Sequence, residues 1–284
     1  MNILISENTD DIRQFMGVDR LRTPQKPFIV VPTTSGTGSE VTLVAVISDT
    51  ENNVKLPFTS NLLLPKIAIL DERMTLSLPA KITAATGMDA LTHAVEAFTC
   101  LQKNPMSDAY ALAAIKLVRE NLVNVVKNGK DKKGRFALAN ASLMAGVAFS
   151  NSMVGAIHAI GHACGAVAHV HHGMAMSILM PFVMEYNMDV IENLYAELLL
   201  TLAGDEVFAS TPKDKRAEKS VEIIRNWQKE LKDACGLHYK LSEAGVSEEQ
   251  LEDIAKTALN DGAMSPNPKD LKFEDVLSIL KKAM

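Results

Sequence analysis

Aromatic residues, cysteines and clustered positive charge are all scarce in this sequence of 284 residues. Aromatic residues make up 5% of the chain, with one tryptophan, so the core has to be built from aliphatic side chains and the 14 methionines, which suits packed helices. Three widely spaced cysteines without a CxxC pair argue against a disulfide framework and fit a reducing cytoplasm. The net charge of −5 and the absence of a basic stripe argue against nucleic acid as the main partner.

Long apolar runs are also missing from the sequence. No segment approaches the roughly 20 uncharged residues that a membrane span needs. The N-terminus lacks the basic stretch and the long apolar core of a signal peptide. We therefore expect a cytoplasmic protein whose partner is neither a membrane nor a nucleic acid. The chain is long enough for one large domain or for two.

Two kinds of sequence pattern meet near Leu78 and Pro79. Before this point, runs rich in Val and Ile predict strands at 27–32, 41–49 and 66–70, and the opening segment is part helix and part loop. After it, helical periodicity predicts helices at 79–100, 105–127, 133–149, 155–167, 173–186, 188–203, 213–235, 247–258 and 273–283, with 204–214 as a loop. The fold class is thus a partial α/β part, residues 1–78, followed by a large all-α domain, residues 79–284.

Six of the seven histidines fall in two apolar segments of the helical part. Asp89 and His93 are four residues apart, so they share one helix face; His158 and His162 repeat this spacing, and His172 follows. One carboxylate and two or three imidazoles from two helices would bind a divalent transition metal. The alternative is that these are ordinary surface or core histidines. Because buried imidazoles need partners, the apolar context favours the metal site.

A segment rich in Gly, Ser and Thr, PTTSGTGSEVT (32–42), directly follows the first predicted strand. Its glycines allow a ligand to approach the backbone, and its hydroxyls can donate to phosphate or ribose oxygens. It is neither a GxGxxG nor a Walker A motif, and turns of this composition are common. Its position after a strand favours cofactor binding.

Taken in order, PTTSGTGSEVT, AATGMDALTHAVEAF, GAIHAIGHACGAVAHVHHGM and NPKD resemble the iron-containing (group III) alcohol dehydrogenases over essentially the whole chain. The resemblance implies a metal site for Fe²⁺, with Zn²⁺ as an alternative, whose ligands are Asp89, His93, His158 and His172. It places His162 near nicotinamide and substrate as a catalytic residue, although a packing role remains open. It also implies contacts to NAD or NADP from Thr33, Thr37, Lys55 and Phe149.

The resemblance implies a Rossmann-like nucleotide-binding part, a homodimer, and hydride transfer between a nicotinamide cofactor and a small primary alcohol, diol or aldehyde. Relative to the family, we find no GGGS pyrophosphate loop and no leading βαβ units in this sequence. One alternative is therefore a truncated, inactive metal-binding remnant. Another is a non-redox relative like the sugar-phosphate cyclases, although their usual carboxylate and two histidines match the motifs here less well.

Overall fold

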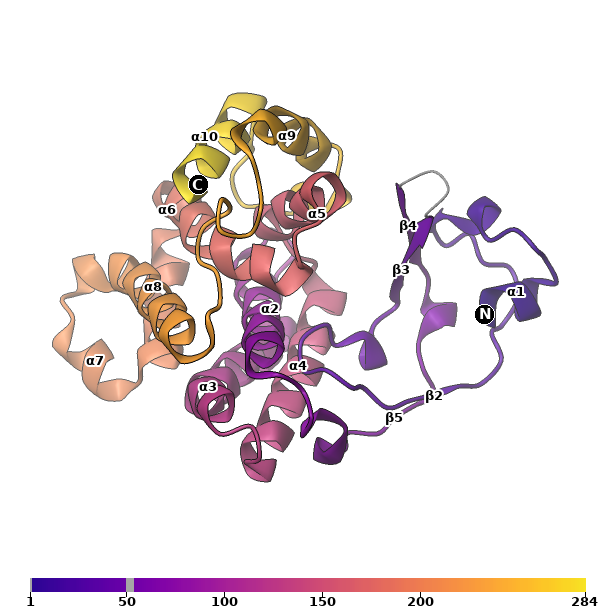
Figure 1. The fold of residues 1–284 in the computed structure, drawn as a ribbon, viewed down its shortest axis with the longest axis horizontal. Coiled ribbons are helices and arrows are strands. Elements are labelled where there is room, and N and C mark those ends of the chain that lie inside the picture. Colours follow the sequence, from indigo (N-terminus) through magenta and orange to yellow (C-terminus); the bar gives the residue numbers. More distant parts are fainter. Residues whose placement is uncertain (1, 50–53) are drawn as a thin grey trace.

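The computed structural model describes residues 2–49 and 54–284, without the side chains of Ser48, Val54 and Lys55. Short strands and α1 (Asn2–Glu7) occupy one region, and a body of packed helices forms the rest (Figure 1). The helices of this body are α2 (Ala80–Thr99), α3 (Pro105–Lys127), α4 (Lys132–Ser152), α5 (Ala156–Ala168), α6 (His172–Ala203), α7 (Asp205–Ser210), α8 (Arg216–Cys235), α9 (Leu251–Leu259) and α10 (Phe273–Ala283). This arrangement confirms the expected fold class.

The strands form two small sheets. Central β4 (Val54–Thr59) pairs in parallel with β1 (Gly17–Val18) and antiparallel with β3 (Val44–Asp49). A separate parallel pair joins β2 (Ile29–Val30) to β5 (Ile67–Ala68). The predicted strands correspond to β2, β3 and β5. Strands β1 and β4 were not predicted, because β1 lacks the run of Val and Ile that marks β2 and β5, and β4 contains a lysine and a proline that are unusual in a strand.

Two details of the helical part differ from the sequence prediction. Residues Asp205–Ser210, predicted as loop, form α7, whose first turn carries Asp205 and Glu206, a favourable position for negative charge. The two helices predicted at 173–186 and 188–203 correspond to the two parts of α6, which meet at a kink at Ile191 with non-helical backbone angles and not at residue 187. At residue 187 the helix is continuous, and the buried Asn187 pairs its amide with that of Asn267.

Two separate apolar clusters stabilise these regions. The larger cluster joins α2 to α6 and α8 to α10, with α2 in contact with α3, α4, α6 and α8. The smaller one lies in the strand region and contains Ile3, Phe15, Leu21, Leu56 and Phe58. Within the described ranges, no single helix is long and apolar enough to span a membrane; only the pair α4 and α5, taken together across a 107° bend, meets that criterion.

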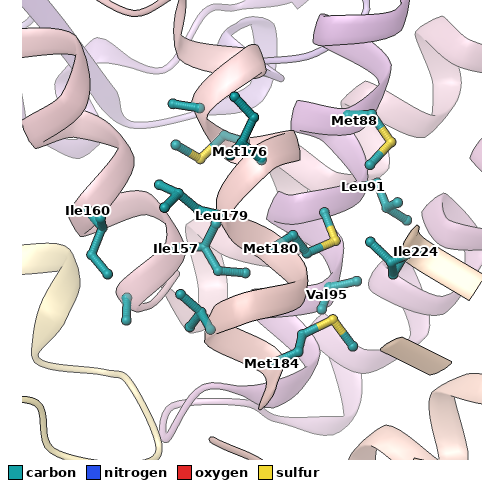
Figure 2. Close-up of a cluster of buried hydrophobic side chains, with 14 of the residues drawn as sticks. Met88, Leu91, Val95, Ile157, Ile160, Met176, Leu179, Met180, Met184 and Ile224 are labelled. Atoms are coloured by element: carbon teal, nitrogen blue, oxygen red, sulfur yellow. The ribbon is translucent and has the colours of Figure 1, made fainter. Parts of the chain in front are cut away.

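One part of the large core lies between α2, α5, α6 and α8. Figure 2 shows it as a cluster of Met, Leu, Ile and Val side chains: Met88, Leu91 and Val95 from α2, Ile157 and Ile160 from α5, Met176, Leu179, Met180 and Met184 from α6, and Ile224 from α8. All of these side chains are buried. Close packing on this side fixes the helices relative to one another.

Candidate metal centre

Three helices bring together the carboxylate and imidazoles that the sequence singled out. Asp89 and His93 lie on α2, His158 on α5 and His172 at the first position of α6. Each offers a ligand atom, and these four atoms lie within 4.8 Å of one another. Asp89 Oδ1 is 3.2 Å from His172 Nε2, 3.8 Å from His93 Nδ1 and 4.0 Å from His158 Nε2. The arrangement places three imidazoles around one carboxylate oxygen.

The close approach of α6 to α2 depends on Gly173, next to His172. A Cβ atom at Gly173 would lie 2.3 Å from the carbonyl oxygen of Ala85, one turn before Asp89. Since this distance is far inside van der Waals contact, only glycine allows the N-terminus of α6 to sit this close to α2. The backbone contact therefore brings His172 to Asp89.

Burial and the contacts within the cluster determine which of its side chains are charged. Asp89, His93 and His158 are buried, and His172 is half-buried. Desolvation lowers the pKa of His93 to about 3 and that of His158 well below its ordinary value. Burial alone would raise the pKa of Asp89, but the surrounding imidazoles outweigh it, so this pKa is lowered. Neutral imidazoles and an ionised carboxylate are the forms that bind a metal.

The residues fit a divalent metal ion. His93 Nδ1 and His158 Nε2 are buried, and neither has a hydrogen-bond partner within the described part of the chain. A buried polar atom without a partner costs about 1–3 kcal/mol. Two such atoms from different helices, both close to one carboxylate oxygen, are explained by a cation that they share. The donor set of three nitrogens and one oxygen suits Fe²⁺, Zn²⁺ and related ions.

Glu96 contacts His158 at Nδ1, the ring nitrogen that does not face Asp89. Its Oε2 is 2.5 Å from His158 Nδ1, and its Oε1 accepts a 2.7 Å hydrogen bond from the backbone N–H of Ile157. Burial raises the pKa of Glu96 to about 7. Glu96 was not predicted as a site residue, although its spacing is a signal: it follows His93 by three residues and Asp89 by seven, on the same face of α2.

His162 lies beside the four candidate ligands. Its ring stacks on that of His172, with centroids 5.3 Å apart and planes 17° apart. Its Nδ1 is 2.8 Å from Asp261 Oδ2, and Asp261 also accepts a hydrogen bond from the backbone of Ala263. The side chain of His162 is 43% exposed, so solvent reaches its ring. Asp261 was also missed by the sequence analysis.

Two further histidines of the second histidine-rich segment, His169 and His171, are exposed. His169 ends α5 with left-handed backbone angles, and His171 is the residue that precedes α6. Neither belongs to the group of four that converges among the described residues. Proximity in sequence to His172 therefore does not bring them into the cluster.

The glycine-rich segment lies against α2 and α4. A Cβ atom at Gly36 would be 2.9 Å from Thr86 on α2, one turn before Asp89. Gly38, with a φ of +61°, lies against Gly146 of α4, where a Cβ atom would be 2.6 Å from the neighbouring Cα. The Gly38 N–H donates to Ser142 Oγ at 3.1 Å. The segment is thus fixed next to the helix that carries Asp89 and His93.

The residues expected to contact the cofactor come from three different parts of the structure. Thr33 and Thr37 are exposed on this segment, and Thr37 Oγ1 accepts a hydrogen bond from the Ser39 N–H. Phe149 on α4 stacks on His93, with centroids 4.4 Å apart and planes 19° apart. Lys55 belongs to β4, and its side chain lies outside the described residues.

Both parts of the chain match known protein families. Residues 83–284 match the family model described as the C-terminal part of the Fe-containing alcohol dehydrogenase family, and residues 1–72 match the model for iron-containing alcohol dehydrogenase. The chain belongs to the iron-containing alcohol dehydrogenase family. This membership identifies it as an oxidoreductase and agrees with the Asp and His cluster.

Relatives and solved structures of this alcohol dehydrogenase family match nearly the whole chain. The chain is 36% identical to an NAD-dependent methanol dehydrogenase of Bacillus methanolicus, over 99% of this chain and 72% of the relative. It is 36% identical to a 1,3-propanediol dehydrogenase of Klebsiella pneumoniae, over 96% of this chain and 69% of the relative. The solved structure of a 1,3-propanediol oxidoreductase superposes with a TM-score of 0.94 at 34% identity, covering 100% of this chain and 72% of its own.

Proposed function

We propose that this chain is a metal-dependent alcohol dehydrogenase that transfers hydride between NAD or NADP and a small primary alcohol, diol or aldehyde. The convergence of Asp89, His93, His158 and His172 carries the proposal. Two contacts connect this cluster to the expected cofactor side: Phe149 stacks on His93, and the glycine-rich segment packs one turn before Asp89. The substrate class follows from relatives that are named methanol and 1,3-propanediol dehydrogenases.

In this proposal, Asp89, His93, His158 and His172 hold the metal. When bound, the metal supplies a Lewis acid for the substrate oxygen and the nicotinamide supplies or accepts the hydride. One carboxylate among three neutral imidazoles leaves a divalent site with net positive charge, which favours an anionic oxygen over a neutral one.

His162 moves the proton. Asp261 accepts from Nδ1 of His162, so Nε2 is the atom that takes up or releases a proton. The partial exposure of this ring provides the exchange with water. On the cofactor side, Thr33 and Thr37 offer hydroxyls, Lys55 a positive charge and Phe149 a flat apolar face for a ring.

One alternative function is that of an inactive metal-binding protein, because the four candidate ligands all lie outside the segment expected to bind the cofactor. Titration of NADH and NADPH into Fe²⁺-loaded protein under anaerobic conditions, followed by reduction of a short-chain aldehyde on the same sample, separates the two functions. Micromolar cofactor binding with turnover that is lost in a chelator is the expected result. Bound iron without cofactor binding or turnover would contradict the dehydrogenase and support the alternative.

We also propose a division into two domains, residues 1–78 and 79–284, because each region has its own apolar cluster. A homodimer is proposed from the family resemblance, and light scattering coupled to size-exclusion chromatography tests it. A cytoplasmic location, without nucleic acid or a membrane as partner, is supported by the net charge of −5 and by three free cysteines.

A further inference from the structure

One buried carboxylate contacts both the start of α5 and the imidazole that α5 contributes to the cluster. Glu96 is 4% exposed and uses both oxygens: Oε1 accepts from the backbone N–H of Ile157, and Oε2 faces His158 Nδ1. A Cβ atom at Gly155 would lie 3.0 Å from Glu96 Oε1, so the carboxylate is closely packed against the chain there. Its position is therefore fixed by contacts on both sides.

We propose that Glu96 is a positioning residue that sets the tautomer and the orientation of His158 for metal binding. Because a carboxylate oxygen accepts, the proton of the neutral ring sits on Nδ1 and the lone pair on Nε2. His158 Nε2 is the atom that lies 4.0 Å from Asp89 Oδ1 and has no hydrogen-bond partner among the described residues. This inference rests on the assignment of His158 as a ligand in the proposed function.

Glu96→Gln tests this role, because glutamate and glutamine have nearly the same shape but differ in the number of hydrogen-bond acceptors. Glutamate at position 96 supplies two acceptors to two donors, whereas glutamine supplies one carbonyl oxygen and one NH₂ group. The Ile157 N–H is a fixed donor, so the carbonyl oxygen of Gln has to face it. The NH₂ group then faces His158 Nδ1 and favours the tautomer protonated at Nε2. That tautomer has no lone pair directed at the cluster.

The start of α5 has a second attachment that does not involve Glu96. Asn267 Oδ1 accepts from the backbone N–H of Ala156 at 3.2 Å and from Asn187 Nδ2 at 3.1 Å. Since Glu96→Gln keeps the acceptor for Ile157 as well, we expect α5 to remain docked in this variant. We therefore expect the substitution to weaken metal binding without undocking α5.

Asp131 provides a matched control. Its Oδ1 accepts from the backbone N–H of Gly134 at the start of α4, and its Oδ2 accepts from Asn124 Nδ2 at 2.8 Å. It is thus a carboxylate that also serves one backbone and one side-chain donor at a helix start. Asp131 lies at the opposite end of α4 from Phe149, and neither of these two hydrogen-bond partners is a histidine. Asp131→Asn removes the same charge away from the cluster.

The experiment is a Co²⁺ titration of the metal-free full chain, followed by visible absorption, for the wild type, Glu96→Gln, Asp131→Asn and His158→Ala. We expect one Co²⁺ per wild-type chain, an affinity about 10–100-fold weaker in Glu96→Gln with a changed absorption band, and an unchanged affinity in Asp131→Asn. Circular dichroism checks that each variant is folded. If Glu96→Gln binds as the wild type does while His158→Ala does not, the inference is wrong and the site stands.

Unchanged binding in His158→Ala would instead overturn the ligand assignment in the proposed function. Should Glu96→Gln fail to fold, the wild type still decides the question. Long-range ¹⁵N–¹H NMR of the Zn²⁺-loaded, ¹⁵N-histidine-labelled protein, with the His158 signal identified by substitution, reports its tautomer. A proton on Nδ1 supports the inference, and a proton on Nε2 contradicts it.

Discussion

Buried polar side chains at the cluster oppose folding unless they share a partner. Asp89, His93 and His158 are removed from solvent, and burial of a charge or an unpaired imidazole is unfavourable. His172 closes the group from α6 at 3.2 Å from Asp89 Oδ1. This third imidazole thus completes a set of four donors around one point, and metal affinity has to depend on it.

Replacement of His172 by alanine tests this dependence, with His171→Ala as the control. His171 is the adjacent residue and is exposed outside the cluster. We expect His172→Ala to weaken metal binding by about 100-fold or more, which exceeds the loss expected for a residue that only hydrogen-bonds a ligand. His171→Ala should bind as the wild type does. Metal content after dialysis against a competing chelator measures both; equal retention by the two variants would contradict the assigned register.

At the same scale, the family resemblance named the four candidate ligands, but the pairing of His158 with Glu96 and of His162 with Asp261 could not be predicted from the sequence. Asp89 and His93 are four residues apart in one helix, so their common face follows from helix geometry. Glu96 and His158 are 62 residues apart, and His162 and Asp261 are 99 apart. Such pairs form only through the packing of separate elements, which no local spacing encodes.

At the scale of elements, the site depends on how closely three helices pack. Met88 and Leu91 of α2 and Met176 and Met180 of α6 belong to the buried apolar core that Figure 2 shows between these helices. At Gly173 the two backbones come into direct contact, on the side of α6 that carries His172. A change of one methyl group there should move a ligand.

Gly173→Ala and Gly165→Ala are a matched pair for this contact. The added Cβ at Gly173 meets the backbone of Ala85 at 2.3 Å, whereas at Gly165 in α5 its nearest neighbour is Val170 O at an ordinary 3.5 Å. We expect Gly173→Ala to cost about 1–3 kcal/mol of unfolding free energy and to weaken metal binding. Gly165→Ala should be neutral or stabilising by up to about 1 kcal/mol. Urea unfolding and metal titration of both variants test the contact; similar behaviour of the two would contradict it.

Local signals predicted some elements well and others poorly. Helix α3 begins at Pro105 because Asn104 caps it and proline suits the first helical turn, and these signals are visible in the sequence. Strand β4 has no such signal, since it is stabilised by its pairing with β1 and β3 on both sides. The continuity of α6 through Asn187 likewise depends on a partner, Asn267, 80 residues away.

At the scale of the whole molecule, the strand region and the helical body meet through the glycine-rich segment. Gly38 lies against Gly146, and Gly36 against Thr86, so the segment expected to bind the cofactor is docked onto the helices that surround the cluster. The four candidate metal ligands, by contrast, come from α2, α5 and α6. The two functions should therefore be separable.

Gly146→Ala is expected to separate them. A Cβ atom there would lie 2.8 Å from Gly38 O and 2.9 Å from Gly38 Cα, so the segment has to move away from α4. An overlap of this kind costs about 1–3 kcal/mol, which corresponds to roughly a tenfold or larger loss in NADH affinity if the cofactor requires the docked position. Metal affinity should not change. Calorimetric titrations of NADH and of metal measure the two effects, and parallel losses in both would contradict the separation.

The metal site itself is tested most directly by anomalous diffraction from crystals of the iron-loaded chain, with data collected on both sides of the iron absorption edge. The account predicts one strong iron peak between Asp89, His93, His158 and His172. A peak at His169 or His171, or well-occupied iron elsewhere with none among these four side chains, would contradict it.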